Sequence, residues 1–243
     1  MSDIELKNNF EKFTDSWTGI LDKNIKALRK DPQFAESFAR VAAFNSLRVD
    51  VIEPKMSKEA YLFVKEAHHD LLIAHTNAMF GSKRSALQSL RSFLENTMMG
   101  LFFQTHPIEQ QKWLKQSFRI APAELRKFFS EHPALKSKDV TNFKDAIGDE
   151  YAVLSKSVHA SAKNVRMVNE DSKGLLWTSE AKELDDFFKH EKKSIATIGF
   201  LIFVIYSEQL SGTKLPNTRQ AFSKIFDATQ KSLLRDGHSV KIS

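Results

Sequence analysis

An Arg and a Glu one helical turn apart form a pair whose types and spacing could support chemistry. Arg91 and Glu95 lie in the stretch from Ser82 to Gln104, where Leu and Met recur at the three- and four-residue spacing of an apolar helix face. Apolar residues also occupy other sides of this stretch, so we expect a central helix covered by its neighbours. An unpaired buried charge is costly, so these two side chains must meet each other or polar groups of another helix. They indicate either a structural ion pair or a polar site between helices.

A second polar group lies further along the chain. Tyr151, Ser155 and His159 are spaced four residues apart and fall within about 80° of a helical circumference, beside an apolar line. An imidazole can act as a general base, and a guanidinium can stabilise developing negative charge. A shared site therefore requires the helix of Arg91 to pack against the helix of His159.

Other residue types argue against several chemistries. His68 and His75 are seven residues apart, roughly 10 Å along a helix axis, so they cannot share a metal as a four-residue pair would. The chain has no Cys, which excludes disulfides and thiolate chemistry. We find no Gly-rich phosphate loop, H-E-x-x-H or G-x-S-x-G motif. We expect neither a metal nor a cofactor.

The elements that must position these residues are predicted to be helices. Eight Gly and six Pro in 243 residues leave long uninterrupted stretches, and the apolar spacing is helical throughout, which predicts an all-α antiparallel bundle. Pro32, Ser57 and Gly81 are expected to mark two helix starts and a tight turn. The helices are expected at about 3–29, 32–49, 57–80, 82–104, 107–118, 122–131, 141–166, 179–210 and 217–235.

Charge and hydropathy bear on partners and location. The net charge is +6, and the excess is concentrated in residues 112–138, with seven basic against two acidic side chains, and 214–243, with six against two. Such patches suit a polyanion such as RNA, although solvated helix faces give the same statistic. The apolar run 195–206 has twelve residues, too few to cross a bilayer comfortably, so we expect a buried helix and no membrane contact. The charged N-terminus lacks the apolar core of a signal peptide, which favours a cytoplasmic location.

The order of these motifs resembles the HEPN-like helical superfamily, in particular its poorly characterised prokaryotic branches. The resemblance covers about residues 68–210 and rests on Arg91, Glu95, Asn96, Tyr151, Leu154, Ser155, Val158 and His159. It implies a bundle of antiparallel helices, frequent homodimers, and roles in RNA cleavage or in prokaryotic defence and toxin systems. It also suggests three parts: an N-terminal helical extension packed on the bundle (1–54), the HEPN-like bundle (55–212), and a C-terminal helix and tail (213–243).

One feature departs from that family. Its ribonucleases carry an Arg followed by a His after four to six residues, and His159 has no Arg at that distance before it. The formal match in this chain is Arg126 with His132, a spacing that chance alone would produce about once (8 × 3 × 10/243, from eight His, three spacings and ten Arg). In a continuous helix these two side chains would point about 120° apart, so Pro133 would have to end the helix for them to meet.

Two functions remain open. In the first, the protein acts on RNA without a metal: His159 takes the proton of a ribose 2′-hydroxyl, Arg91 stabilises the phosphate, and Glu95, Tyr151 and Ser155 orient them. In the second, the same residues form an interior network in a non-catalytic helical module that binds a regulatory protein partner or a small ligand.

Overall fold

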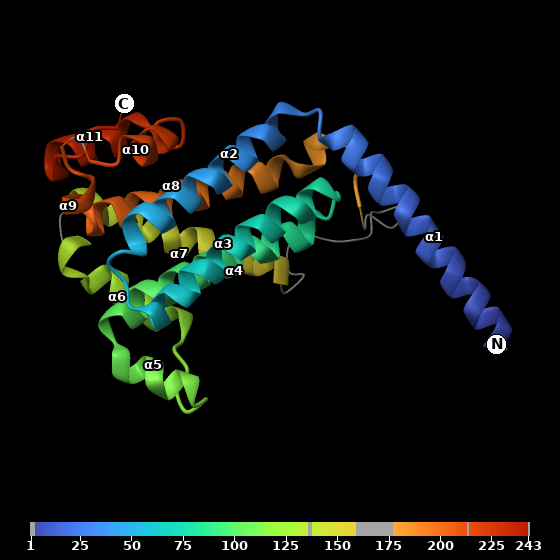
Figure 1. Ribbon diagram of the computed structural model, residues 1–243, viewed down its shortest axis with the longest axis horizontal. Helices are drawn as coiled ribbons and strands as arrows, with labels where there is room; N and C mark the ends of the chain where they lie inside the picture. The colour runs from blue at the N-terminus through green and yellow to red at the C-terminus, as the bar shows by residue number, and fades with distance from the viewer. Residues whose placement is uncertain (1–2, 136–137, 159–176, 213, 243) are drawn as a thin grey trace.

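The computed structural model describes residues 3–135, 138–158, 177–212 and 214–242, and in these ranges it contains helices and turns but no strand (Figure 1). The predicted all-α class is confirmed. The α-helices are α1 (Asp3–Leu28), α2 (Pro32–Leu47), α3 (Lys58–Met79), α4 (Lys83–Thr105), α5 (Pro107–Leu114), α6 (Pro122–Glu131), α7 (Lys138–Val158), α8 (Asp185–Ile205), α9 (Ser207–Leu210), α10 (Pro216–Phe222) and α11 (Ala228–His238). A π-helical turn, η1 (Arg48–Ile52), continues α2, and 3₁₀ turns lie at Pro133–Leu135 (η2) and Ala181–Leu184 (η4).

The body of the fold is a bundle built around the α3–α4 hairpin. These two helices make the most extensive contact in the molecule; α4 also packs against α7 and α8, and α2 packs against α3 and α8. Figure 1 shows these five helices running side by side, with α9–α11 gathered at one end of the bundle. Fully buried Phe side chains fill the interior, and the rings of Phe44 and Phe93 meet edge to face with centroids 5.0 Å apart. The apolar sides of α4 are therefore covered, as its sequence predicted.

Local sequence signals account for most helix starts in the bundle. Asp31 accepts a hydrogen bond from the backbone N–H of Gln33 and precedes Pro32, the first residue of α2. Ser57 caps α3 by accepting a hydrogen bond from the N–H of Ala60. The predictions for Pro32 and Ser57 are confirmed.

The turn between α3 and α4 depends on Gly81. Its φ of +81° is unfavourable for residues with a side chain, and its carbonyl accepts a hydrogen bond of 3.0 Å from the N–H of Thr178. A Cβ at this position would lie 2.0 Å from the carbonyl oxygen of Thr178. Both the positive φ of Gly81 and the close approach of the Thr178 backbone therefore require glycine at this position. The predicted tight turn is confirmed.

Four predicted helices differ from the structure in their bounds. The helix expected at 107–118 ends at Leu114. The helix expected at 141–166 begins at Lys138, and its expected end lies outside the described residues. Ser179 does not cap the following helix: a 3₁₀ turn comes first, α8 begins at Asp185, and Tyr206 leaves the helical conformation between α8 and α9. The helix expected at 217–235 is two helices, because Asp227 and Gln230 form a capping box that starts α11.

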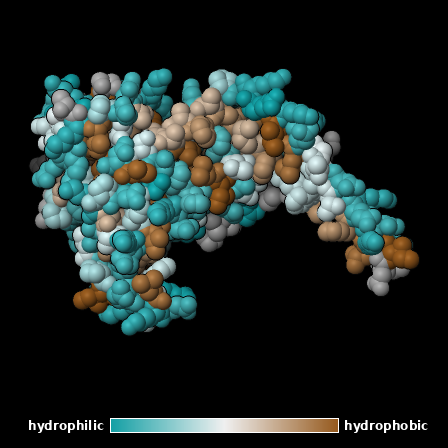
Figure 2. Space-filling view, in the orientation of Figure 1, coloured by the Kyte–Doolittle hydropathy of each residue, from teal (hydrophilic) through white to brown (hydrophobic). Residues whose placement is uncertain are grey.

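The N-terminal segment meets the bundle in two different ways. α2 is part of the bundle, whereas α1 meets the rest of the chain over its C-terminal half: Leu28 is buried and Asn24 donates to the carbonyl of Phe80 at 2.9 Å. Further toward the N-terminus of α1, the ring of Trp17 meets the ring of Trp177 edge to face, with centroids 4.9 Å apart. The remainder of α1 projects away from the body (Figures 1 and 2). Six large apolar side chains of α1 are exposed: Ile4, Leu6, Phe10, Phe13, Trp17 and Ile20. The division of the chain into an N-terminal extension, a bundle and a C-terminal part stays a prediction.

The strongest apolar run of the sequence lies inside the bundle. Ile195, Ile198 and Phe200–Phe203 of α8 have no exposed side-chain surface. In the described ranges, we find no helix with both the length and the apolar character required to span a membrane.

We predict that Gly81→Ala lowers the free energy of unfolding by about 2 kcal/mol or more, because the new Cβ combines an unfavourable φ with a backbone clash. Gly212→Ala is the matched control, since Gly212 has a similar φ of +66° but no atom within 4 Å of the new Cβ. There we expect about 1 kcal/mol from backbone conformation alone. Urea denaturation of both variants measures the difference, and equal losses would contradict the role given to the Thr178 contact.

Candidate functional site

The α4–α7 contact brings together three of the predicted site residues. Arg91 Nη2 donates to Glu95 Oε1 at 2.8 Å and to the Tyr151 hydroxyl at 2.7 Å. The same hydroxyl donates to Glu95 Oε1 at 2.6 Å, so the three groups form a closed triangle. The four-residue spacing on α4 supplies the ion pair, and α7 supplies the phenol. Arg91 and Glu95 of the central helix α4 are therefore paired with each other and with Tyr151 of α7.

The triangle lies at the edge of the core. Tyr151 is 7% exposed, while the side chains of Arg91 and Glu95 are 24% and 31% exposed. Burial raises the pKa of Tyr151, and the hydrogen bond to Glu95 raises it further. The phenol is therefore protonated at neutral pH and acts as a donor to the carboxylate. The Nε of Arg91 is buried and has no hydrogen-bond partner among the described residues.

A second arginine converges on the same tyrosine. The Cζ atoms of Arg91 and Arg126 lie 5.1 and 5.8 Å from the centre of the Tyr151 ring, distances at which a cation interacts with an aromatic ring. Arg126 comes from α6, and Gly148 of α7 leaves room for it: a Cβ at Gly148 would lie 3.2 Å from Arg126 Cδ. We call Arg91, Glu95, Arg126 and Tyr151 the arginine–tyrosine site.

The last described turn of α7 also contacts α4. Arg84 Nε donates to the carbonyl of Ser157 at 3.0 Å, and Gln88 Nε2 approaches the same carbonyl at 3.4 Å. Together with the Tyr151 triangle they fix α7 against α4 along two turns.

The remaining predicted site residues do not join the triangle in the described structure. Ser155 donates to the carbonyl of Tyr151 in its own helix at 2.8 Å, so its hydroxyl is used within α7. His159 lies outside the described residues. α6 ends at Glu131, and His132 adopts an extended conformation before Pro133, as a meeting with Arg126 would require. Its Nδ1 accepts from the N–H of Ala134 at 3.3 Å, and burial lowers its pKa.

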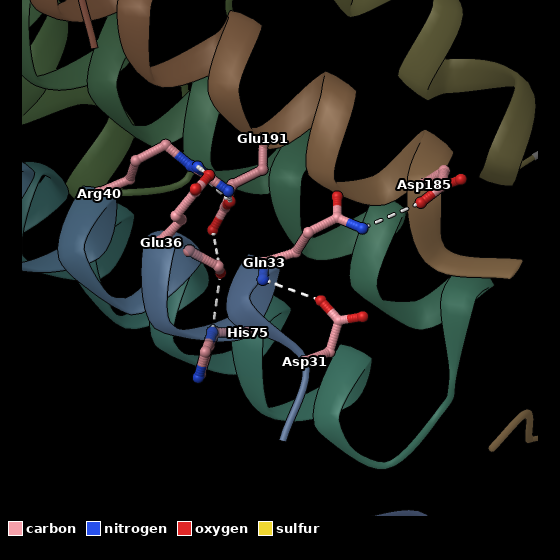
Figure 3. A network of polar contacts seen from close by, with 8 residues as sticks. Asp31, Gln33, Glu36, Arg40, His75, Asp185 and Glu191 are labelled. Atoms are coloured by element: carbon pink, nitrogen blue, oxygen red, sulfur yellow. Dashed lines mark hydrogen bonds and ion pairs between the residues drawn. The ribbon is translucent and has the colours of Figure 1, made fainter. Parts of the chain in front are cut away.

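Sequence reasoning missed a buried network that links α2, α3 and α8 (Figure 3). Glu191 is fully buried; its Oε2 accepts from Arg40 Nε at 2.9 Å and Nη2 at 2.6 Å, and its Oε1 accepts from Ser37 Oγ at 2.6 Å. Since Ser37 gives its proton to Glu191, it accepts from Nδ1 of His75 at 2.8 Å. Burial raises the pKa of Glu191 and lowers that of His75. The polar groups of the network bind one another, which indicates a structural role.

A second buried carboxylate joins α7 to α8. Glu150 is 1% exposed; it contacts Nδ1 of His190 at 2.6 Å and Nζ of Lys193 at 3.0 Å. The sequence signal for both networks is the group of charged residues before the apolar run of α8. Because a helix that becomes apolar further on lies in the interior, its charged side chains need polar partners.

His68 and His75 occupy different surroundings on α3. His75 belongs to the Glu191 network, whereas His68 lines a pocket with Arg48, Lys65 and His69. Between that pocket and the arginine–tyrosine site, Asn96 donates to Asp70 at 2.7 Å. Burial raises the pKa of Asp70 to about 6, opposed by this hydrogen bond. Within the described residues, no group of three His, Asp or Glu side chains is placed to hold a metal ion.

Comparison with known proteins supplies no relative: no family model, no curated protein and no solved structure matches this chain. The HEPN-like resemblance therefore stays a prediction from short motifs.

Proposed function

We propose that this protein binds RNA at the arginine–tyrosine site and acts as a HEPN-like protein of a prokaryotic defence or toxin system in the cytoplasm. The observation that carries the proposal is the convergence of two guanidinium groups, from α4 and α6, on one tyrosine ring. Arginine binds phosphate through paired N–H donors, and its planar group also stacks on bases. Two such groups held at fixed positions suit a phosphate backbone.

Surrounding charge supports the same ligand. Arg126 belongs to the segment 112–138, which contains seven basic and two acidic residues. Contacts with RNA phosphates depend on such positive charge, which also attracts the strand over a longer range. Tyr151 is too buried to stack on a base, so in this proposal it orients the two arginines.

Cleavage would require a general base in addition to the arginines. His159 is our candidate: its imidazole would accept the proton of a ribose 2′-hydroxyl as that oxygen attacks the adjacent phosphorus. The bond from phosphorus to the 5′-oxygen would then break, leaving a 2′,3′-cyclic phosphate and a 5′-oxygen that takes a proton to become a hydroxyl. Arg91 would stabilise the charge that grows on the phosphate oxygens, and Glu95 and Tyr151 would hold Arg91 in place. The reaction needs no metal ion.

A second function is favoured by the closed geometry of the triangle. Arg91 Nη2 already donates to both Glu95 and Tyr151, so the cluster can serve as a lock that fixes the register of α4 against α7. In that case the protein is a non-catalytic module that binds a protein partner or a small ligand.

We predict that Arg126→Ala weakens binding of a single-stranded RNA by about tenfold, because one of two guanidinium contacts is lost. Lys127→Ala is the matched control: it removes the same charge from the adjacent position of α6, where the side chain is 71% exposed. Fluorescence anisotropy at two salt concentrations measures both affinities, and incubation of the RNA in chelator with wild type and His159→Ala tests cleavage. No RNA binding by the wild type, or equal affinities for both variants, would contradict the RNA proposal.

The same protein samples test the second function. A pure register lock predicts no RNA binding, together with a loss of about 1–2 kcal/mol in the free energy of unfolding for Tyr151→Phe, which removes the shared hydroxyl.

A further inference from the structure

A small pocket beside the end of α2 gathers four nitrogen-bearing side chains. Arg48, Lys65, His68 and His69 line a pocket of about 280 Å³. This volume is at the small end of the range for ligand sites, so it suits a compact group. Arg48 is the first residue of the π-helical turn η1, and π-helical turns occur frequently at functional sites.

The guanidinium of Arg48 is oriented by neutral groups. Its Nε and Nη2 donate to Asn45 Oδ1 at 3.2 and 2.6 Å, and its Nη1 donates to the hydroxyl of Tyr61. These contacts use three of the five N–H donors of an arginine, which leaves two for another acceptor. The Tyr61 hydroxyl in turn donates to Glu53 at 2.7 Å, and burial raises its pKa to about 12. The guanidinium is therefore held in one orientation, and two of its N–H donors remain available to another acceptor.

Lys65 brings a second positive charge to the same place. Its Nζ lies 5.3 Å from the centre of the Tyr61 ring, and the Cζ of Arg48 lies 5.7 Å from that centre. Over the described ranges, no carboxylate lies within ion-pair distance of either cation, in contrast to Arg40 with Glu191 and Arg91 with Glu95. Two cations that converge without a protein anion favour an anionic ligand.

The two histidines complete a set of donors. Burial lowers the pKa of His68, and the charge of Arg48 adds to this effect, so the imidazole is neutral near pH 7 and offers one N–H. His69 is exposed beside it on α3. The nearby carboxyl of Asp70 is bound by Asn96 and the carboxylate of Glu53 by Tyr61, so both have partners of their own.

We propose that this pocket, bounded by Arg48, Lys65, His68 and His69, binds a phosphate group. A tetrahedral oxyanion accepts hydrogen bonds from several directions, which matches donors that arrive from η1 and from two turns of α3. The group can come from an RNA strand or from a small phosphate compound. The site is separate from the arginine–tyrosine site and stands whether or not that site binds RNA.

Isothermal titration calorimetry with inorganic pyrophosphate tests the proposal on the full chain. Wild type should bind saturably, and Lys65→Ala and His69→Ala, both at exposed positions, should each weaken binding by about fivefold or more. Lys58→Ala is the matched control, because it removes the same charge from an exposed position of α3 outside the pocket. The absence of saturable binding, or equal weakening by all three variants, would overturn the proposal.

Two further measurements identify the source of the phosphate and separate the two sites. An oligoribonucleotide with a 5′-phosphate and the same strand with a 5′-hydroxyl are titrated into wild type and Lys65→Ala. Equal weakening of both strands by the variant supports an internal phosphodiester, weakening of the phosphorylated strand alone supports a terminal phosphate, and a response limited to pyrophosphate supports a small compound. Arg126→Ala should leave pyrophosphate binding unchanged, and loss of that binding in Arg126→Ala alone would overturn the assignment to this pocket.

A different observation concerns the outer part of α1. Leu6, Phe10, Phe13, Trp17 and Ile20 fall within about 80° of the helix circumference and are 39–64% exposed. Trp17 contacts the ring of Trp177 edge to face, and 40% of its surface stays exposed. This apolar stripe is too long for chance exposure of single residues. α1 carries five acidic and four basic residues, a net charge of 4 − 5 = −1, which does not suit an anionic membrane or a nucleic acid.

We infer that the stripe pairs with the same stripe of a second copy, in an antiparallel arrangement about a two-fold axis near Phe13. The stripe is self-complementary about that point, since Leu6 and Ile20 each lie seven residues, or two turns, from it. Three half-exposed aromatic side chains and two aliphatic ones, with their polar flanks, would bury about 600 Å² per copy. The total of about 1,200 Å² is at the lower limit for a specific dimer.

The absence of Cys makes the arrangement testable with single cysteine variants. Light scattering after size exclusion should give twice the monomer mass, and Phe13→Cys should form an intermolecular disulfide, because the two-fold axis places its copies at the short distance a disulfide needs. Leu6→Cys should crosslink with Ile20→Cys and not with itself. A monomer mass at all concentrations, or no faster crosslinking of Phe13→Cys than of Ile108→Cys on exposed α5, would overturn the inference. Self-crosslinking of Leu6→Cys would overturn the antiparallel arrangement.

Discussion

Charged side chains that enter the bundle must be neutralised there, and the fold is organised by where this happens. Glu191 is fully buried and is matched by Arg40 from another helix. Glu150 is matched by His190 and Lys193, and Arg91 by Glu95. The Arg40–Glu191 contact and the contacts of Glu150 each join two helices, and removal of one partner would leave a buried charge without compensation. Arg91 and Glu95 pair within α4, and the hydroxyl of Tyr151 joins them to α7. The α2–α8, α7–α8 and α4–α7 contacts are specified in this way.

Two clusters share the same arrangement around a tyrosine but differ in how their charges are paired. In each, a tyrosine hydroxyl accepts from an arginine and donates to a glutamate: Tyr151 with Arg91 and Glu95, and Tyr61 with Arg48 and Glu53. In each, a second cation also approaches the ring: Arg126 in the first and Lys65 in the second. At Tyr151 the glutamate also contacts the arginine, whereas at Tyr61 it does not. The first cluster is therefore closed on itself apart from Arg126, while in the second no carboxylate of the described residues lies within ion-pair distance of Arg48 or Lys65.

Local spacing predicted what lies within one helix or at its ends. The Arg91–Glu95 pair follows from four-residue spacing, and Tyr151 from its place beside an apolar line. Ser57, Pro32 and Gly81 act through neighbouring backbone, so they too could be recognised. The split between α10 and α11 was also encoded, in Asp227 and Gln230, and was overlooked because the apolar pattern continues across it.

Long-range contacts could not be predicted from one sequence. Arg40 and Glu191 are 151 positions apart, and nothing in the local pattern of either says which helix will face the other. The one signal at Arg126 is a spacing to His132 that is common by chance, whereas in the structure Arg126 reaches the site through Tyr151 of another helix. Ser155 was predicted on the same side of α7 as Tyr151, but its hydroxyl donates to a backbone carbonyl of its own helix. The break at Tyr206 has neither Gly nor Pro to mark it.

The central claim is that RNA contacts the surface where α4, α6 and α7 meet. Photocrosslinking of wild type to a single-stranded RNA that contains 4-thiouridine, followed by mass spectrometry of the crosslinked peptides, tests it most directly. The account predicts crosslinks in the peptides that carry Arg91, Arg126 or Tyr151. Crosslinks confined to residues 214–243, or a complete absence of crosslinks, would contradict it.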